Sequence, residues 1–234
     1  MLANSGHGTR STVTKLIRGG HVTVNGTVIK DSGYHVKDDD DVAIDGESVV
    51  SKKHLYFIFD KPDEVLTAME DKRLPNVGDF IPPHLANLKL SPVGRLDYHT
   101  TGLLIITNDG ELSHRITSPK YKLPKKYLIT YKGAPLNKKH VEEAASGMTL
   151  YDMDTPTVLS PAILELISDD TACLTLYEGK THEVRRMISS WGCEVLELRR
   201  ISIGQIKIPE TSVPGTLTEL SDELVASLKK DVSL

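Results

Sequence analysis

A series of short apolar segments, each bounded by turn residues, dominates the chain after residue 54. The segments are rich in Ile, Leu, Val and Tyr and read LYFIFDKP, GLLIITNDG, KKYLITYKG, AILELIS, ACLTLYEGK and EVLELRRISIGQIKI. Such side chains favour strands because they pack well on a pleated, half-buried surface. Between them, KKHVEEAASGM and HEVRRMISSWG have helical spacing, and SDELVASLKK predicts a C-terminal helix capped by Ser221. The pattern predicts an α+β fold whose mixed, largely antiparallel sheet is flanked by helices.

A small α/β module precedes this region. Val13, Leu16 and Ile17 follow a polar segment at helical spacing, which predicts a helix that ends at Gly19-Gly20. The segment HVTVNGTVIK then alternates apolar and polar residues around Asn-Gly, a strong hairpin signal, and DVAIDG adds a further strand. A unit of this size is too small to hold an active site by itself.

The boundary between the two parts is expected in the polar segment ESVVSKKH, residues 47–54. We therefore expect a module at residues 1–48 and a main domain at residues 55–234. A chain of 234 residues suits this division, because it is long for a single small module and short for two full-sized domains.

The composition indicates a globular protein, with 39% hydrophobic and 26% charged residues. No basic stretch leads into an apolar run at the N-terminus, and no segment approaches ~18 consecutive apolar residues, so we expect neither a signal peptide nor a membrane span. The two cysteines, Cys173 and Cys193, form no CxxC pair and lack metal-ligand spacing. A reduced, cytoplasmic protein without a metal is the expectation.

Basic residues are unevenly distributed in a chain whose formal net charge is −4. Residues 1–30 contain no acid, and neither do residues 112–141. The basic residues of the two segments are Arg10, Lys15, Arg18, Lys30, Arg115, Lys120, Lys122, Lys125, Lys126, Lys132, Lys138 and Lys139. Binding to nucleic acid depends on where charge lies more than on its sum. The two segments indicate phosphate contact, with ordinary solvated surface as the alternative.

The most unusual stretch is GRLDYHTTGLLIITNDGEL, residues 94–112. It places Arg95 and Asp97 in a polar loop directly before a buried strand, and loops at the ends of rigid strands are where reactive groups tend to be mounted. From the residues alone, Asp97 could equally make an Asx-type turn that starts the strand.

GRLD followed by TGLLIITNDG resembles the central motif of the pseudouridine synthases, specifically of the RsuA-type branch. The resemblance extends to Asp60-Lys61-Pro62, to Lys125-Lys126-Tyr127 before a strand, and to EGKTHEVRRMISSWG with ELRRISIG after it. These motifs run in order from about residue 56 to 208, and the first 48 residues resemble the small RNA-binding module of ribosomal protein S-four. The sequence departs from the family pattern after Pro62, where a glycine is expected and Asp63-Glu64-Val65 follows, so the turn there is left open.

The resemblance implies isomerisation of a uridine to pseudouridine without a metal or an organic cofactor. The bond from ribose C1′ to uracil N1 breaks, the base turns, and the bond forms again through C5. Asp97 is implied as the ionised carboxylate near the sugar. Two routes stay open: the carboxylate attacks C1′, or it takes a proton from C2′ to give a glycal.

The resemblance also implies partners for this carboxylate. Arg185 matches the position that pairs with the catalytic Asp, and an opposite charge a few Å away keeps a carboxylate ionised and oriented. Tyr127 matches the active-site tyrosine that stacks on the flipped base, and Arg95 the residue that holds the target nucleotide out of its helix. The alternatives are a solvent-facing helix arginine, a half-buried core tyrosine, and a salt bridge from Arg95 to Asp97 or Asp109.

Further RNA contacts are expected from basic side chains near these motifs and in the first module. They are Lys61, Lys125, Lys126 and Arg186, together with Arg10, Lys15 and Arg18. Arg185 and Arg186 point about 100° apart on a helix, so only one of the two is expected to face the site. Within the branch, the segment 113–133 resembles the small-subunit ribosomal RNA enzyme more than its large-subunit relatives, which implies small-subunit ribosomal RNA, free or in an assembly intermediate, as the partner. A monomer is the simplest expectation for the oligomeric state.

Four other functions remain as alternatives. The first is a synthase of the same branch that modifies large-subunit RNA, and the second is a ribosome-assembly factor that binds RNA without catalysis. A glycosidase would use Asp97 and Asp109 as a carboxylate pair, about 5 to 9.5 Å apart. Against that reading, Asn108-Asp109-Gly110 is better explained as a turn that ends the strand. A metal hydrolase would need ligands from His99, His114 and His182, whose neighbours form no known ligand motif.

Overall fold

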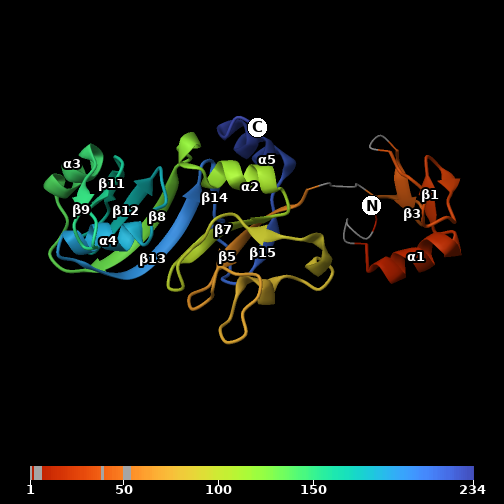
Figure 1. Cartoon of the computed structure of the whole chain (residues 1–234), viewed down its shortest axis with the longest axis horizontal. Coiled ribbons are helices and arrows are strands. Elements are labelled where there is room, and N and C mark those ends of the chain that lie inside the picture. The colour runs from red at the N-terminus through yellow and green to blue at the C-terminus, as the bar shows by residue number, and fades with distance from the viewer. Residues whose placement is uncertain (1, 3–6, 38–39, 50–53) are drawn as a thin grey trace. The chain divides into compact units, whose positions relative to one another are not determined.

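The computed structural model describes residue 2 and residues 7–37, 40–49 and 54–234. The chain divides into two compact units (Figure 1): Met1–Leu55 with Ile81–Leu90, and Tyr56–Phe80 with Ser91–Leu234. The inclusion of Ile81–Leu90, which contains the 3-10 helix η3 (Ala86–Leu88), in the first unit was not expected from the sequence. The expected linker, residues 47–54, lies partly outside the described residues, and the boundaries at 48 and 55 stay predictions.

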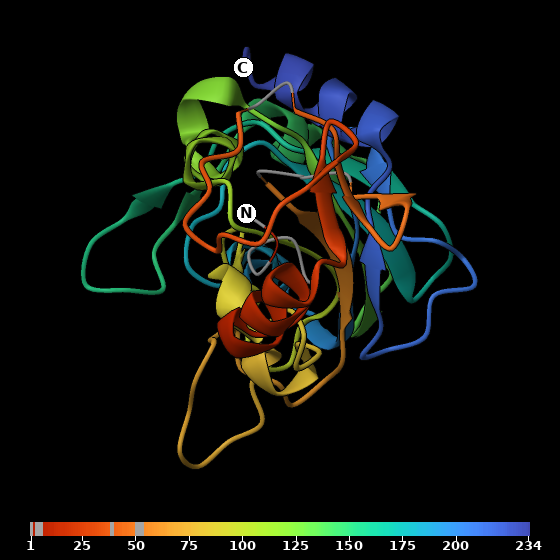
Figure 2. The same ribbon diagram turned by 90° about the vertical axis from the view of Figure 1, so that its right-hand side faces the viewer.

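The first unit contains the expected helix and hairpin (Figure 2). Helix α1 (Arg10–Gly19) begins at Thr9, whose side chain accepts the Thr12 N–H, and ends at Gly20, which has a φ of 83°. The sheet has the order β2-β1-β3-β4, with β1 Val22–Val24, β2 Thr27–Val28, β3 Val42–Ile44 and β4 Glu47–Ser48. Val13 of the helix packs with Val22, Val24 and Val42 in one small core.

Strand β4 was missed, because Glu47 and Ser48 were assigned to the linker. Asp45 and Gly46 have φ angles of 50° and 86°, which is the conformation that a two-residue hairpin turn requires. The Asp-Gly pair is therefore the signal that could have found the strand. A linker cannot begin before residue 49.

The second unit is built on one long sheet (Figure 1). Its strands lie in the order β11-β12-β8-β13-β7-β5-β15, with β14 added to β13 and β6 to β7. The bounds are β5 Tyr56–Lys61, β6 Ser91–Pro92, β7 Thr101–Thr107, β8 Lys125–Lys132, β11 Ile163–Leu166, β12 Thr171–Leu176, β13 Glu194–Ile203, β14 Ile206–Lys207 and β15 Leu217–Glu219. Of these pairs only β13 with β7 is parallel, so the prediction of a largely antiparallel mixed sheet is confirmed.

Helices cover the sheet in two groups. Helices α2 (Gly110–Thr117) and α5 (Asp222–Asp231) lie beside each other and share an apolar core with β5 and β7 (Figure 1). Helices α3 (Lys138–Ser146) and α4 (Glu183–Ser190) pack near β11 and β13. A two-stranded hairpin, β9 (Thr149–Leu150) with β10 (Thr157–Val158), stands apart from the long sheet, and short 3-10 helices occur at Val77–Phe80 (η2) and Pro119–Tyr121 (η4). None of the helices in the described residues has the length and apolar character needed to span a bilayer.

Helix α2 was also missed, since Asn108-Asp109-Gly110 was interpreted as a turn that ends a strand. Asp109 is instead the N-cap of α2: its Oδ1 accepts the Leu112 N–H at 3.0 Å, and the Tyr56 hydroxyl donates to its Oδ2 at 2.7 Å. A carboxylate at this position accepts a hydrogen bond from a free N–H of the first turn. Its negative charge also interacts favourably with the positive end of the helix dipole.

The turn after Pro62 has the backbone conformation for which the family pattern led us to expect a glycine. Glu64 adopts a φ of 57°, a left-handed conformation that glycine takes without cost. The Glu64 N–H donates to the Tyr98 carbonyl at 3.1 Å, so the turn forms despite the side chain. The turn is therefore present, with Glu64 in place of the expected glycine.

Candidate active site

A pocket of about 530 Å³ opens where three parts of the second unit meet. One wall is the loop before β7, which carries Arg95 and Asp97. A second wall is the segment 179–184 at the start of α4, and Tyr127 of β8, Leu176 of β12 and Leu198 of β13 complete the lining. The volume lies within the range of small-ligand sites in proteins. The structure thus brings Arg95, Asp97 and Tyr127 together, as the sequence predicted.

The Asp97 side chain is available to a ligand, because it is 40% exposed and makes no hydrogen bond within the described residues. The turn at this point is closed by backbone alone, since the Thr100 N–H donates to the Asp97 carbonyl at 3.0 Å. The alternative of an Asx-type turn is therefore wrong. The imidazole of His182 lies next to the carboxylate, with its Nε2 3.6 Å from Oδ1.

Close packing of β7 against β13 sets the position of this loop. Gly102 of β7 lies opposite Arg200 of β13 in the parallel pair. A Cβ atom at Gly102, whose φ is 93°, would lie 2.3 Å from the Arg200 carbonyl oxygen. Glycine is required here because any side chain would push the two strands apart.

The buried ammonium of Lys61 binds the backbone of the Asp97 loop. Its ammonium donates to the carbonyl oxygens of Pro62 at 3.0 Å, Tyr98 at 3.1 Å and Thr100 at 2.9 Å. Burial lowers the pKa of Lys61 to about 8, and the nearby carboxylates of Asp63 and Asp97 oppose that shift. The expected contact between Lys61 and RNA is wrong, because the side chain is 0% exposed and its donors are used inside the protein.

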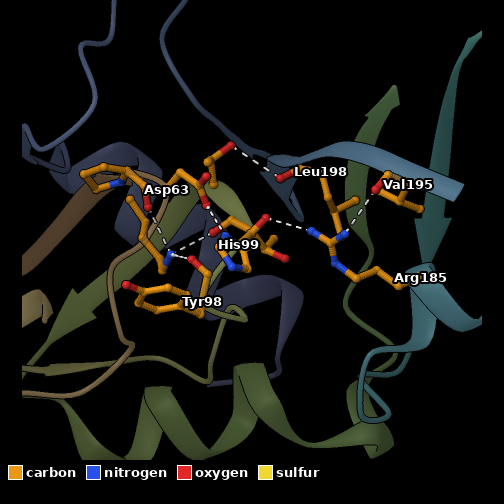
Figure 3. Close-up of polar contacts among 10 residues, drawn as sticks. Asp63, Tyr98, His99, Arg185, Val195 and Leu198 are labelled. Carbon is orange, nitrogen blue, oxygen red and sulfur yellow. Dashed lines mark hydrogen bonds and ion pairs between the residues drawn. The ribbon is translucent and has the colours of Figure 1, made fainter. Parts of the chain in front are cut away.

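Arg185 also binds the backbone of this loop. Figure 3 shows its guanidinium pointing to the backbone: Nη2 donates to the His99 carbonyl at 2.8 Å and Nη1 to the Val195 carbonyl at 3.4 Å. No ion pair within 4.0 Å joins Arg185 to Asp97, both of which the structure describes. The expected ion pair is therefore not formed, because the guanidinium is engaged two residues further along the loop. Lys61 and Arg185 together bind the three successive carbonyls that follow Asp97.

Arg186 points away from the site, as expected for one of two adjacent helix arginines. Its guanidinium pairs with Asp152 through Nε at 2.7 Å and Nη2 at 2.6 Å, and Nη2 also donates to the Thr157 hydroxyl at 2.9 Å. The residue ties α4 to the β9–β10 hairpin. The expected contact between Arg186 and RNA is therefore wrong, because its guanidinium is bonded to Asp152 and Thr157.

The remaining basic side chains fall into two groups. Lys126 pairs with Glu165 at 2.5 Å, and half-buried Lys125 donates to the Leu123 carbonyl at 3.4 Å, with its pKa lowered first by burial and then by Arg200. These two face protein groups in the structure, and their RNA contacts stay predictions. Arg95 is exposed at the pocket and pairs with neither Asp97 nor Asp109, so the alternative of a structural salt bridge is wrong. Arg10, Lys15 and Arg18 are exposed on α1.

Tyr127 lies on the sheet floor of the pocket. It is opposite Leu174 on one side and Arg200 on the other, and its side chain is largely buried. A ring held by two neighbouring strands keeps a fixed orientation, which is what a stacking platform needs.

Comparison with known proteins identifies the family. A model described as RNA pseudouridylate synthase matches residues 55–190. The chain belongs to this family. A model of the S4 domain matches residues 1–42 of the same synthase. The resemblance drawn from the sequence motifs is confirmed in both parts.

Relatives of this pseudouridylate synthase align over nearly its whole length. It is 37% identical over 233 residues to an uncharacterized RNA pseudouridine synthase of Aquifex aeolicus, covering 98% of this chain and 94% of the relative. It is 38% identical over 224 residues to ribosomal small subunit pseudouridine synthase A of Pasteurella multocida, covering 95% and 94%. A crystal structure of a pseudouridylate synthase superposes with a TM-score of 0.69 at 34% identity, covering 97% of this chain and 96% of that one.

Two residues of the synthase's pocket were missed as site residues. His182 was considered only as a metal ligand, and Glu183 was not considered. Glu183 is 4% exposed; its Oε2 accepts the Lys180 N–H at 2.8 Å, while its Oε1 has no hydrogen-bond partner among the residues that the structure describes. Burial, followed by the charge of Glu178, raises the pKa of Glu183 to about 7. The signal that could have found His182 was its place in the EGKTHEVRR motif, three residues before Arg185.

The geometry also decides between the alternative chemistries. Asp97 and Asp109 stand at opposite ends of β7, which at about 3.3 Å per residue separates them by roughly 20 Å. A carboxylate-pair glycosidase is therefore excluded. Within the described residues no cluster of three or more His, Cys, Asp or Glu side chains has the arrangement of a metal site.

Proposed function

We propose that this synthase converts a specific uridine of small-subunit ribosomal RNA to pseudouridine, with Asp97 as the carboxylate on which the reaction depends. One observation carries the proposal: the Asp97 carboxylate makes no hydrogen bond to the described chain and lines a pocket that Tyr127 also lines. A group that must act on ribose has to be free of internal partners and yet held in place. The bonds from Lys61 and Arg185 to the loop backbone supply the second condition.

Each residue of the pocket has its own role in the proposed reaction. Asp97 acts at the sugar, either by attack on C1′ or by removal of a proton from C2′. The N1–C1′ bond breaks, the base turns, a C5–C1′ bond forms, C5 loses its proton and N1 gains one. Tyr127 stacks on the base during this exchange, and a stacked base is worth roughly 1–3 kcal/mol. Arg95, exposed at the rim, holds the nucleotide out of its helix, which costs a few kcal/mol.

The choice of RNA rests on the relatives. The synthases of Pasteurella multocida and of Escherichia coli strain K12, the latter 36% identical over 220 residues, are named for the ribosomal small subunit. An S4 match at residues 1–42 supports a structured RNA as the target. The proposal includes an assembly intermediate of the small subunit as substrate, action as a monomer, and a cytoplasmic location, where both buried cysteines stay unpaired.

The Asp97→Asn variant tests this proposal. The amide keeps the size of the side chain and removes the charge, so we expect isomerisation to fall by at least about 10³-fold with little change in folding or RNA affinity. Transcripts of small-subunit and large-subunit ribosomal RNA, free and partly assembled, are incubated with enzyme. Pseudouridine is mapped by carbodiimide-stopped primer extension.

The matched control is Asp169→Asn, which makes the same exchange at an exposed aspartate away from the pocket. A new stop on one RNA that disappears only in Asp97→Asn establishes both the activity and the target. Full activity of Asp97→Asn would remove this residue from the mechanism. A stop on large-subunit RNA alone would reassign the substrate.

A further inference from the structure

Thr67 binds the residue that separates Arg95 from Asp97 in the pocket loop. Its hydroxyl donates to the Leu96 carbonyl at 2.7 Å and accepts the Leu96 N–H at 3.1 Å. One hydroxyl thus satisfies both backbone groups of a residue that is 5% exposed and lines the pocket. A buried N–H or carbonyl without a partner is costly, so these two bonds fix the peptide planes on both sides of Leu96.

Those two peptides lead to the side chains proposed to act on the nucleotide. The Leu96 N–H belongs to the peptide shared with Arg95, and the Leu96 carbonyl belongs to the peptide shared with Asp97. A rotation of either peptide would turn the attached side chain relative to the pocket. Lys61 and Arg185 bind carbonyls that follow Asp97, so the contact from Thr67 holds a different part of the loop.

The segment that carries Thr67 is itself held immediately before this residue. The Leu66 N–H donates to the Pro75 carbonyl at 2.8 Å, and the Leu66 carbonyl accepts the Val77 N–H at 3.0 Å. Both backbone groups of Leu66 are therefore bound to a neighbouring segment of the chain. This fixes the direction in which the backbone enters Thr67.

Close packing holds the segment after Thr67 as well. The Gly78 N–H donates to the Ala68 carbonyl at 3.3 Å and to Asn76 Oδ1 at 3.0 Å. A Cβ atom at Gly78 would lie 1.9 Å from the Met69 carbonyl oxygen, so only glycine permits this approach. The hydroxyl of Thr67 is thus presented by a backbone fixed on both sides, and a β-branched side chain has few rotamers.

We propose that Thr67 is a positioning residue of the synthase: its hydroxyl sets the orientation of Asp97 and Arg95 by binding the peptides on both sides of Leu96. The inference rests on the proposed role of Asp97. Orientation matters steeply, because a misplacement of about 1 Å can lower a rate by ~10²-fold. Thr67 is absent from the described residues that line the pocket, so it acts through the loop and not on the nucleotide.

A purely structural role for Thr67 makes a different prediction. If the hydroxyl only satisfied buried backbone groups, its removal would lower the free energy of unfolding and leave the rate of the folded enzyme unchanged. If the hydroxyl positions the loop, the rate falls in protein that is fully folded. The two roles are separated by measuring kcat on variants whose folding is checked by urea denaturation.

Hydrogen exchange of the Leu96 amide tests the contact without RNA and without turnover. Thr67→Val keeps the shape of the side chain and removes the hydroxyl, whereas Thr67→Ser keeps the hydroxyl. We expect the Leu96 amide to exchange about 5- to 10-fold faster in Thr67→Val and at nearly the wild-type rate in Thr67→Ser. Thr67→Ala gives the same test if Thr67→Val does not fold. Wild-type exchange in the variant without the hydroxyl would overturn the inference.

Kinetics supply the second measurement. In Thr67→Val we expect kcat to fall about 10- to 100-fold, while Thr67→Ser restores it to within about threefold of wild type. KM should change by less than about threefold, because phosphate contacts supply much of the affinity for RNA. A kcat of Thr67→Val equal to wild type, or a kcat of Thr67→Ser as low as that of Thr67→Val, would count against the proposal.

The matched control is Thr216→Val. It makes the same exchange at an exposed threonine whose hydroxyl donates to the Val213 carbonyl at 2.7 Å. Thr216 is not one of the described residues that line the pocket, so this variant should keep wild-type kcat. A loss of kcat equal to that of Thr67→Val would mean that the exchange itself, and not the contact with Leu96, lowers the rate.

The two proposals fail separately. An inactive Asp97→Asn combined with wild-type kcat in Thr67→Val removes only the positioning role. An active Asp97→Asn removes the proposed mechanism and, with it, the reason for positioning Asp97.

Discussion

Glu183 shows at the scale of one residue how burial changes the charge of a side chain in the pocket wall. The pKa of its carboxyl is about 7, above the ordinary value of 4.5, because burial and Glu178 disfavour the charged form. Between these two values the folded protein binds a proton that the unfolded chain has released. The contribution of Glu183 to stability therefore decreases as pH rises from about 4.5 through 7.

The Glu183→Gln variant should remove this dependence. The amide oxygen still accepts the Lys180 N–H, while no charge has to be buried at high pH. We expect the variant to gain stability relative to the wild type as pH rises from 5 to 8, by up to about 3 kcal/mol. Urea unfolding at several pH values measures the difference, with the exposed Glu142→Gln as control. A difference that is constant with pH would contradict the assignment.

At the scale of elements, the Asp97 loop depends on the end of one strand and on a helix. Lys61 ends β5, Arg185 lies in α4, and both donate to loop carbonyls that precede β7. Buried carbonyls without donors are costly, so each cation stabilises the loop by satisfying them. The same bonds leave Asp97 in a fixed position without touching its carboxylate.

Replacing Lys61 by Met tests the role of the strand end. The apolar stem is kept, and the donors to the Pro62, Tyr98 and Thr100 carbonyls are removed. We expect the free energy of unfolding to fall by roughly 2–4 kcal/mol and kcat to fall with it. Lys72→Met, at an exposed lysine, should change stability by less than about 0.5 kcal/mol in the same denaturation experiment. A variant as stable as wild type would mean that the three carbonyls do not need this donor.

At the scale of the whole molecule, a net charge of −4 is compatible with RNA binding because the positive charge is localised. Helix α1 carries Arg10, Lys15 and Arg18 exposed within an arc of about 140°, opposite the face that contains Val13. Charge gathered on one helix face can contact successive phosphates. This face is the expected RNA contact of the S4 domain.

The double variant Arg10→Ala, Arg18→Ala should weaken RNA binding and flatten its salt dependence. Removing one cation that binds a phosphate lowers the slope of log K against log salt by roughly 0.7–0.9, so we expect a change of about 1.5 for the pair. Filter binding over a range of salt concentrations gives the slope. The control removes the same charge from exposed Lys207 and Lys230 of the other unit. An unchanged slope in the α1 variant would take this helix out of the interface.

The sequence by itself determined the elements with local signals. Helix α1 was predicted by apolar spacing and a terminal glycine, and the hairpin of β1 and β2 by Asn25-Gly26. Strands β5, β7, β8, β11, β12 and β13 of the long sheet were predicted by runs of apolar and aromatic residues, whereas the short strands β6 and β15 were missed. The family was predicted by ordered motifs. Each of these depends on neighbours within a few residues, which periodicity and turn chemistry describe well.

Only the tertiary structure decided which charged side chains meet. Lys61 and Arg186 face protein groups, Arg185 binds backbone, and His182 faces Asp97. For each of the three hydrogen-bonded residues, the partner most distant in the sequence lies 34 to 86 positions away, so no local pattern records it. A basic residue in a motif has the same sequence signature whether it faces phosphate or a buried carbonyl, and packing alone selects between the two.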